Sequence, residues 1–158
     1  MKRTTLITAI LTSLLLTKST TYAGDIKKMN QTEKDVYSTI ENMTNAFHKG
    51  DIKGLMGSYE DQAVVVFEPH KPASDADQIR QMFEGAFQIN PNFTYAGHDV
   101  FVSGDIALHI APWQMTGKTP DGADIQQSGL SVAVLRKQVD GSWLMVIDNP
   151  HGQILMAQ

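Results

Sequence analysis

The chain contains no cysteine among its 158 residues, so disulfide bonds, thiolate metal sites and cysteine nucleophiles are excluded. Positive charge is also scarce, because 13 lysines and arginines stand against 17 aspartates and glutamates, for a formal charge of -4. A nucleic-acid-binding protein normally needs a basic face, so no nucleic-acid partner is expected. The 42% of hydrophobic residues and the absence of low-complexity segments indicate one folded domain rather than a disordered chain or a multi-span membrane protein.

The N-terminus has the layout of a secretory signal. Lys2 and Arg3 precede an apolar stretch over residues 6–16, and Ala23 offers a small residue at the cleavage position. This apolar stretch is too short to span a bilayer, although an uncleaved anchor helix is the alternative. We therefore expect a signal peptide over residues 1–23, a single domain over residues 24–158, no membrane span after cleavage, and a periplasmic or secreted location.

The first half of the remaining chain predicts three helices. Apolar residues recur at helical spacing at Val36, Ile40, Met43 and Phe47, which indicates an amphipathic helix that packs on a core. The first helix is expected to be capped by Thr32 with Asp35 and to end at Gly50. Asp51 is expected to cap a short second helix. The third helix is expected to be capped by Ser74 with Asp77 and to end at Asn90-Pro91.

Strands account for most of the rest. The β-branched run from Ala63 to Phe67 is typical of a buried strand, and Glu68-Pro69 ends it. Four further strands are predicted over residues 93–102, 106–116, 125–136 and 143–149, joined by turns of the hairpin type. The apolar phase of the first of these slips near Gly97-His98, which predicts a bulge. Helices followed by an antiparallel meander predict an α+β fold with a curved sheet and a ligand cavity in its hollow.

Several strings occur in a characteristic order along the chain. They are Phe47-His48-Lys49-Gly50-Asp51, Tyr59-Glu60-Asp61-Gln62-Ala63-Val64, Val134-Leu135-Arg136, Asp140-Gly141-Ser142-Trp143 and Val146-Ile147-Asp148-Asn149-Pro150. With these strings the chain resembles the SnoaL-like branch of the NTF2-like superfamily, which also contains the ketosteroid isomerases. The resemblance implies an NTF2-like cone, in which a curved antiparallel sheet wraps around three N-terminal helices, and a homodimer formed through the sheet. It does not imply one activity, because the fold hosts isomerases, cyclases, dehydratases, hydrolases and non-catalytic domains.

Glu68 is the expected general base. It ends an apolar strand in the string Val66-Phe67-Glu68-Pro69, which looks like the segment that carries the base of the isomerases. At the mouth of an apolar cone, partial desolvation would raise its pKa and suit it to proton abstraction. The alternative is that Glu68 caps the following loop or pairs with Lys71. Steroid isomerisation itself is not expected, because Met43 stands at the position of the isomerases' tyrosine. In addition, no acid stands where their second donor is expected, near Gln127, Ser128 and Leu130.

The expected proton partner of Glu68 is His70, His98 or His109. The hypotheses are a Glu68–His70 couple or an Asp99–His109 couple, and for each histidine the alternative is a surface or satisfied interior position. The residues expected to bind the ligand are His98, Asp99, Trp113, Asp148 and Met43. Trp113 can instead pack in the core or at a dimer face, and Asp148 can simply terminate its strand.

No metal and no cofactor are expected. The histidines lack the spacing of a zinc site, and no glycine-rich phosphate loop is present. The leading hypothesis is an exported SnoaL-like domain that binds a small, largely apolar molecule and carries out cofactor-free acid/base catalysis of the isomerase, lyase or hydrolase type. The alternative is a non-catalytic dimeric binding or assembly domain whose cone is filled by its own side chains. The residues alone leave open which of the two applies.

Overall fold

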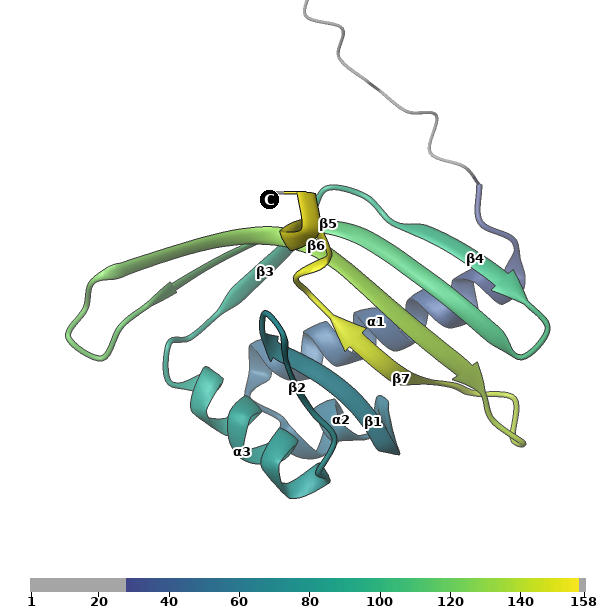
Figure 1. The fold of residues 1–158 in the computed structure, drawn as a ribbon, viewed down its shortest axis with the longest axis horizontal. Coiled ribbons are helices and arrows are strands. Elements are labelled where there is room, and N and C mark those ends of the chain that lie inside the picture. Colours follow the sequence, from purple (N-terminus) through teal and green to yellow (C-terminus); the bar gives the residue numbers. More distant parts are fainter. Residues whose placement is uncertain (1–27, 157–158) are drawn as a thin grey trace, which may run out of the picture.

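The computed structural model describes residues 28–156, and in them three helices lie on the concave side of a curved, unclosed sheet (Figure 1). The elements are α1 (Gln31–Lys49), α2 (Ile52–Met56), β1 (Tyr59–Glu68), β2 (Lys71–Ala73), α3 (Ala76–Phe87), β3 (Asn92–Tyr95), β4 (Asp99–Ser103), β5 (Ile106–Lys118), β6 (Asp124–Lys137), β7 (Trp143–Asn149) and the 3-10 helix η1 (Gly152–Met156). The expected signal peptide, residues 1–23, lies outside the described residues. Within residues 28–156 no helix is long and apolar enough to cross a membrane.

The helix starts differ by a residue or two from those expected. Asn30 rather than Thr32 caps α1, because its side chain accepts from the Glu33 amide at 3.0 Å and the Glu33 carboxylate accepts from the Asn30 amide at 2.8 Å. Asp75 rather than Ser74 caps α3. The stop of α1 is as predicted, because Gly50 has φ 64°, a left-handed conformation that glycine adopts without strain.

The sheet has the strand order β2-β1-β7-β6-β5-β3, and β4 also pairs with β5. The α+β class and the curved sheet are confirmed. The expectation that all strands are antiparallel is wrong at one pair, because β1 runs parallel to β7. The two strands lie far apart in the chain, so no hairpin turn dictates their relative direction. The short strand β2, which forms a hairpin with β1, was not expected from the sequence.

The predicted bulge separates β3 from β4. Tyr95 pairs with Trp113 and Asp99 pairs with Ile110, so three residues of one strand face two residues of β5. Residues 96–98 therefore leave the regular ladder, and His98 is turned toward α1, where its ring contacts Tyr37.

The core between helices and sheet contains a cluster of aromatic rings. The ring of Phe47 on α1 meets those of Phe83, Phe87 and Phe93 edge to face, with centroids 5.8, 5.3 and 5.4 Å apart. Such pairs contribute about 0.5–1.5 kcal/mol each beyond the area they bury. The same rings fix the distance between α1, α3 and the sheet, and so define the space that lies beside them.

Candidate functional site

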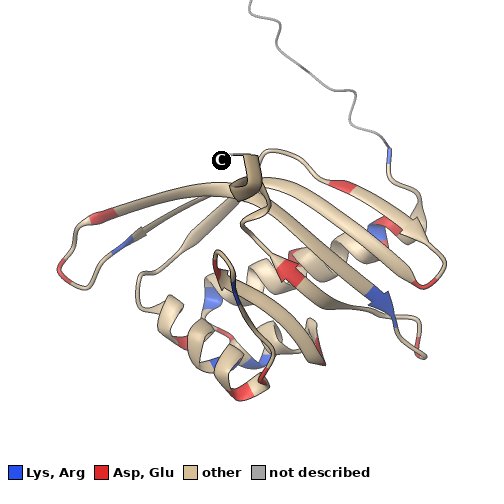
Figure 2. Cartoon of the chain, viewed as in Figure 1, with Lys and Arg blue, Asp and Glu red and all other residues tan. Residues whose placement is uncertain are grey.

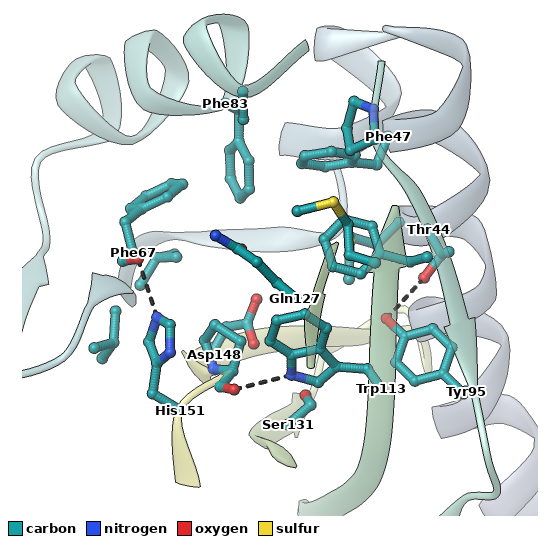
Figure 3. Close-up of a pocket in the computed structure, with 18 of the residues that line it drawn as sticks. Thr44, Phe47, Phe67, Phe83, Tyr95, Trp113, Gln127, Ser131, Asp148 and His151 are labelled. Carbon is teal, nitrogen blue, oxygen red and sulfur yellow. Dashed lines mark hydrogen bonds between the residues drawn. The ribbon is translucent and has the colours of Figure 1, made fainter. Parts of the chain in front are cut away.

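A cavity of about 220 Å³ lies between α1, α3 and the concave face of the sheet (Figure 3). Its walls are mostly apolar and include Met43, Phe47, Val65, Phe67, Phe83, Phe93, Trp113 and Met115. This volume is below the roughly 300–1,000 Å³ of drug-sized pockets. It exceeds the roughly 150 Å³ of an apolar cavity that admits benzene. The cavity therefore fits a small molecule of one or two rings.

Polar atoms reach the cavity from a few side chains only. These belong to Thr44, Tyr59, Tyr95, Gln127, Ser131, Asp148 and His151. Among the described residues no lysine or arginine lines the cavity, so its one carboxylate faces no opposing cation of that kind. A mostly apolar wall with a few convergent polar groups is the usual pattern of a ligand site.

Asp148 and Tyr59 form the central polar pair. They come from β7 and β1, and the parallel pairing of these strands, with Val65 opposite Asp148, brings them together. The Tyr59 hydroxyl donates to Asp148 Oδ2 at 2.8 Å. Burial raises the pKa of Asp148, although the hydrogen bond from Tyr59 and the proximity of His151 oppose this shift. Burial, together with the charge of Asp148, raises the pKa of Tyr59 well above its usual range, so Tyr59 remains a hydrogen-bond donor.

The segment after β7 forms the rim beside Asp148 (Figure 3). Trp113 Nε1 donates to the Pro150 carbonyl at 2.9 Å, and His151 Nε2 lies 3.0 Å from the Phe67 carbonyl. Because a carbonyl only accepts, His151 Nε2 carries the proton and Nδ1 of the neutral ring is an acceptor. Gly129, opposite Trp113 on β6, leaves room for the indole, because a Cβ there would lie 2.8 Å from the ring.

A second polar pair, from α1 and β3, lies on another part of the wall. The hydroxyls of Thr44 and Tyr95 are 3.3 Å apart, and in the view of Figure 3 Trp113 lies between them and Asp148. Burial raises the pKa of Tyr95, which keeps this hydroxyl protonated at neutral pH. The cavity thus offers hydrogen-bond donors on a part of its wall away from Asp148, where they can hold a polar atom of a ligand.

Three of the expected ligand-binding residues line this cavity, namely Met43, Trp113 and Asp148. Sequence reasoning missed Tyr59 and Tyr95. Tyr95 has the same strand parity as Phe93, which places both on the cavity side, and this parity was a usable signal. Nothing local singles out Tyr59, because its partner lies 89 positions away.

Glu68 does not lie at the mouth of the cavity. Its side chain is 61% exposed and forms an ion pair with Lys71 Nζ at 2.5 Å. The hydrogen bond and charge of Lys71 lower the pKa of Glu68. The expected desolvation and raised pKa are therefore wrong, and the alternative of a pair with Lys71 holds. His70 is exposed in the β1–β2 turn with φ 64°, outside the cavity wall, so no Glu68–His70 couple forms there.

The expected Asp99–His109 couple is also wrong. Val100, not Asp99, pairs with His109, so strand alternation directs the Asp99 side chain to the opposite face, where it is exposed. His109 is fully buried, and its Nε2 lies 2.9 Å from Nδ1 of His98. Burial, with a smaller effect of His98, lowers the pKa of His109 to about 4. Neither His98 nor His109 lines the main cavity.

Comparisons with known proteins agree with this architecture. The sequence profile of the SnoaL-like domain matches residues 40–144. No curated protein sequence matches the chain. A ketosteroid isomerase-like protein from Erwinia carotovora atroseptica is 18% identical, with 76% of this chain and 95% of that one covered and a TM-score of 0.65.

Two further solved structures have the same fold. One is a proposed dehydratase of the NTF2-like family from Streptomyces avermitilis, 16% identical, with 73% of this chain and 92% of that one covered and a TM-score of 0.66. The other is a proposed scytalone dehydratase from Novosphingobium aromaticivorans, 14% identical, with 73% and 79% covered and a TM-score of 0.65. At such identities the similarity shows the fold and not the reaction. The profile match over residues 40–144, together with the curved sheet around three helices, shows that the chain belongs to the SnoaL-like domain family and has the NTF2-like fold.

Proposed function

We propose that the protein binds a small, largely apolar molecule in the cavity and that Asp148 acts there as a general base in a cofactor-free reaction. The observation that carries this proposal is the placement of a carboxylate in a mostly apolar wall, held by the Tyr59 hydroxyl at 2.8 Å. Burial raises the pKa of Asp148, and a carboxylate made more basic is a better acceptor for the proton of a carbon acid or of water.

The chemistry needs only a proton transfer. Asp148 takes a proton from the carbon next to a carbonyl group, and the electron pair moves toward the carbonyl oxygen. In an isomerisation the proton returns to another carbon of the same molecule. In a dehydration the electron pair returns from the oxygen to form a C=C bond, the C–O bond at the neighbouring carbon breaks, and the leaving hydroxyl group takes the proton from Asp148 to form water. The Thr44–Tyr95 hydroxyl pair is positioned to donate to the developing oxyanion, and one such donor contributes about 3–4 kcal/mol to the transition state.

The test uses 2-tetralone, a two-ring ketone, as a probe. Exchange of its α-protons in deuterated buffer is followed by proton NMR with the intact protein, the Asp148→Asn variant and a Glu68→Gln control. We expect exchange above the buffer rate, its loss in Asp148→Asn, and full retention in Glu68→Gln because Glu68 is exposed. Equal exchange by the intact protein and Asp148→Asn would remove Asp148 from the mechanism.

A non-catalytic binding domain is the second candidate. It is favoured by the aromatic rings around Phe47, which already occupy much of the space between helices and sheet. Titration of 2-tetralone against the fluorescence of a Trp143→Phe variant, in which Trp113 of the cavity wall is the remaining tryptophan, separates the two candidates. Saturable quenching without proton exchange supports a binding domain, whereas quenching with exchange supports an enzyme.

We also propose that the protein is exported and acts in the periplasm or outside the cell. The support is the sequence of residues 1–23, with its basic start, apolar stretch and small residue at position 23. Intact-mass analysis of the protein from an extracellular or periplasmic fraction tests this, with a chain that begins at residue 24 as the expected result. Recovery of the whole chain in the cytoplasm would contradict it.

Finally, we propose that the protein is a homodimer that pairs through the convex face of its sheet. Leu108, Ile110, Val132, Val134 and Ile147 lie next to one another on this face by strand register, away from the helices. Figure 2 shows that the charged residues of β5 and β6 lie at the ends of these strands, which leaves the middle of both strands without charge. Contiguous apolar area of this kind is typical of a surface that another chain covers.

A further inference from the structure

A second, smaller groove of about 150 Å³ opens between α1 and the bulge that joins β3 to β4. Tyr37, Glu41 and Asn45 line it from successive turns of one face of α1, and Tyr95 and His98 line it from the other side. It neighbours the main cavity, because Thr44 and Tyr95 line both and their hydroxyls are 3.3 Å apart, but Asp148 lines only the main cavity.

Three aromatic rings, those of Tyr37, Tyr95 and His98, form part of the walls of this groove. The ring of His98 stands edge-on to Tyr37, with centroids 4.5 Å apart, and is tilted against Tyr95 at 5.0 Å. His109 holds the His98 ring in place from behind through the 2.9 Å contact between Nε2 of His109 and Nδ1 of His98. The three rings are thus fixed before any ligand arrives, which lowers the entropic cost of binding.

Glu41 provides the charge of the groove. It takes part in none of the ion pairs between residues 28 and 156, and no lysine or arginine lines the groove within that range. Its carboxylate is close enough to Tyr37 to raise the pKa of that hydroxyl, after the larger effect of burial. Burial lowers the pKa of His98, so this ring is neutral above pH 7 and does not neutralise Glu41.

We propose that this groove binds an organic cation, a quaternary ammonium or alkylated amine group, against the rings of Tyr37, Tyr95 and His98 and beside the carboxylate of Glu41. A cation within about 6 Å of an aromatic ring is attracted by the negative face of that ring, and the carboxylate adds a direct charge interaction. A metal ion fits less well, because residues 28–156 contain no group of three or more ligating acidic or histidine side chains. Glu41, which supplies the charge of the groove, does not line the main cavity.

The test measures binding of choline at pH 7.5 by NMR titration, with 3,3-dimethyl-1-butanol as the uncharged analogue of the same shape. We expect saturable shifts in Tyr37, Tyr95 and His98 with choline, and binding of the neutral analogue at least about fivefold weaker. Equal affinity for the two compounds, or no saturable binding of choline, would overturn the proposal.

Two variants probe the recognition itself. Glu41→Gln keeps the shape and removes the charge, and Tyr37→Leu keeps the charge and removes a ring, so each is expected to weaken choline binding at least about threefold. Glu84→Gln, at an exposed site on α3, is the matched control and leaves choline binding unchanged. Unchanged binding in Glu41→Gln would overturn the proposal. Exchange of 2-tetralone protons is expected to persist in Glu41→Gln. The cation-binding proposal and the proposed function of the main cavity are therefore tested separately.

Discussion

Lowering the pH from 7 to 4 is expected to weaken the fold through His109. This side chain is fully buried, its Nδ1 has no hydrogen-bond partner among the described residues, and burial lowers its pKa to about 4. An unfolded chain binds a proton at this position below pH 6.5, the ordinary value, whereas the folded chain does not until about pH 4. The unfolded state therefore gains protons first, and the free energy of unfolding falls as the pH falls between these values.

The size of the effect follows from the two pKa values. A difference of 6.5 to about 4 gives a full loss of about 3.4 kcal/mol, of which about 3 kcal/mol is reached by pH 4, where the folded histidine is half protonated. Well above pH 6.5, where the unfolded chain no longer binds this proton, His109 contributes no pH dependence. His98 shifts in the same direction, and Glu41, the charged group that acts on it, opposes this shift. Asp148, with its raised pKa, works in the opposite sense, because its burial penalty is relieved as the pH falls.

Urea denaturation at pH 7 and pH 4 isolates the contribution of His109 when the intact protein is compared with His109→Gln, because the glutamine side chain binds no proton in this pH range. We expect the intact protein to lose about 3 kcal/mol more than the variant between the two pH values. His70→Asn is the control, since His70 is exposed and asparagine tolerates its positive φ, and its pH dependence should match that of the intact protein. The same pH dependence in His109→Gln and the intact protein would refute the reasoning.

Three other predictions concern packing and assembly. Thr39→Val removes the buried hydrogen bond of 2.8 Å to the Trp143 carbonyl and should cost about 1–3 kcal/mol in urea denaturation, and no change would show that water replaces the hydroxyl. Gly129→Ala places a Cβ 2.7 Å from the Pro150 carbonyl and should cost about 1–3 kcal/mol. Gly85→Ala, where a Cβ meets nothing within 4 Å in α3, is its control and should stabilise the protein by about 0.5–1 kcal/mol. Val134→Lys on the convex face should give a monomer in sedimentation velocity, and an unchanged dimer would move the interface elsewhere.

Features that depend on neighbours in the chain could be predicted from the sequence. Gly50 ends α1 and Asp51 caps α2 as expected, and β7 spans the predicted residues, because backbone conformation and hydrogen bonds within a few residues decide these points. The slip of strand phase near His98 correctly predicted the bulge, since side-chain direction alternates along any strand. The caps of α1 and α3 were misplaced, because Asn30 and Asp75 compete with equally suitable neighbours.

The candidate site was only partly predictable. Met43 and Trp113 were identified as candidates by their position and residue type, and Asp148 by its place at the end of β7. Glu68 was wrongly expected to be desolvated, because its environment depends on the β2 hairpin, which turns the strand end toward Lys71 and solvent. The sequence could not distinguish a strand end at a cavity from one at the surface.

The sequence by itself determined the α+β class, the helix with its apolar stripe, the hairpins from β4 to β7 and the bulge, since these arise from periodicity and turn chemistry between residues close together in the chain. Only the tertiary structure decided which carboxylate is buried and which is exposed. The parallel pairing of β1 with β7 brings Tyr59 to Asp148 across 89 positions, and the same curved sheet leaves Glu68 in water. Burial, and with it the pKa of each group, depends on everything that packs around a side chain, and no local pattern contains that information.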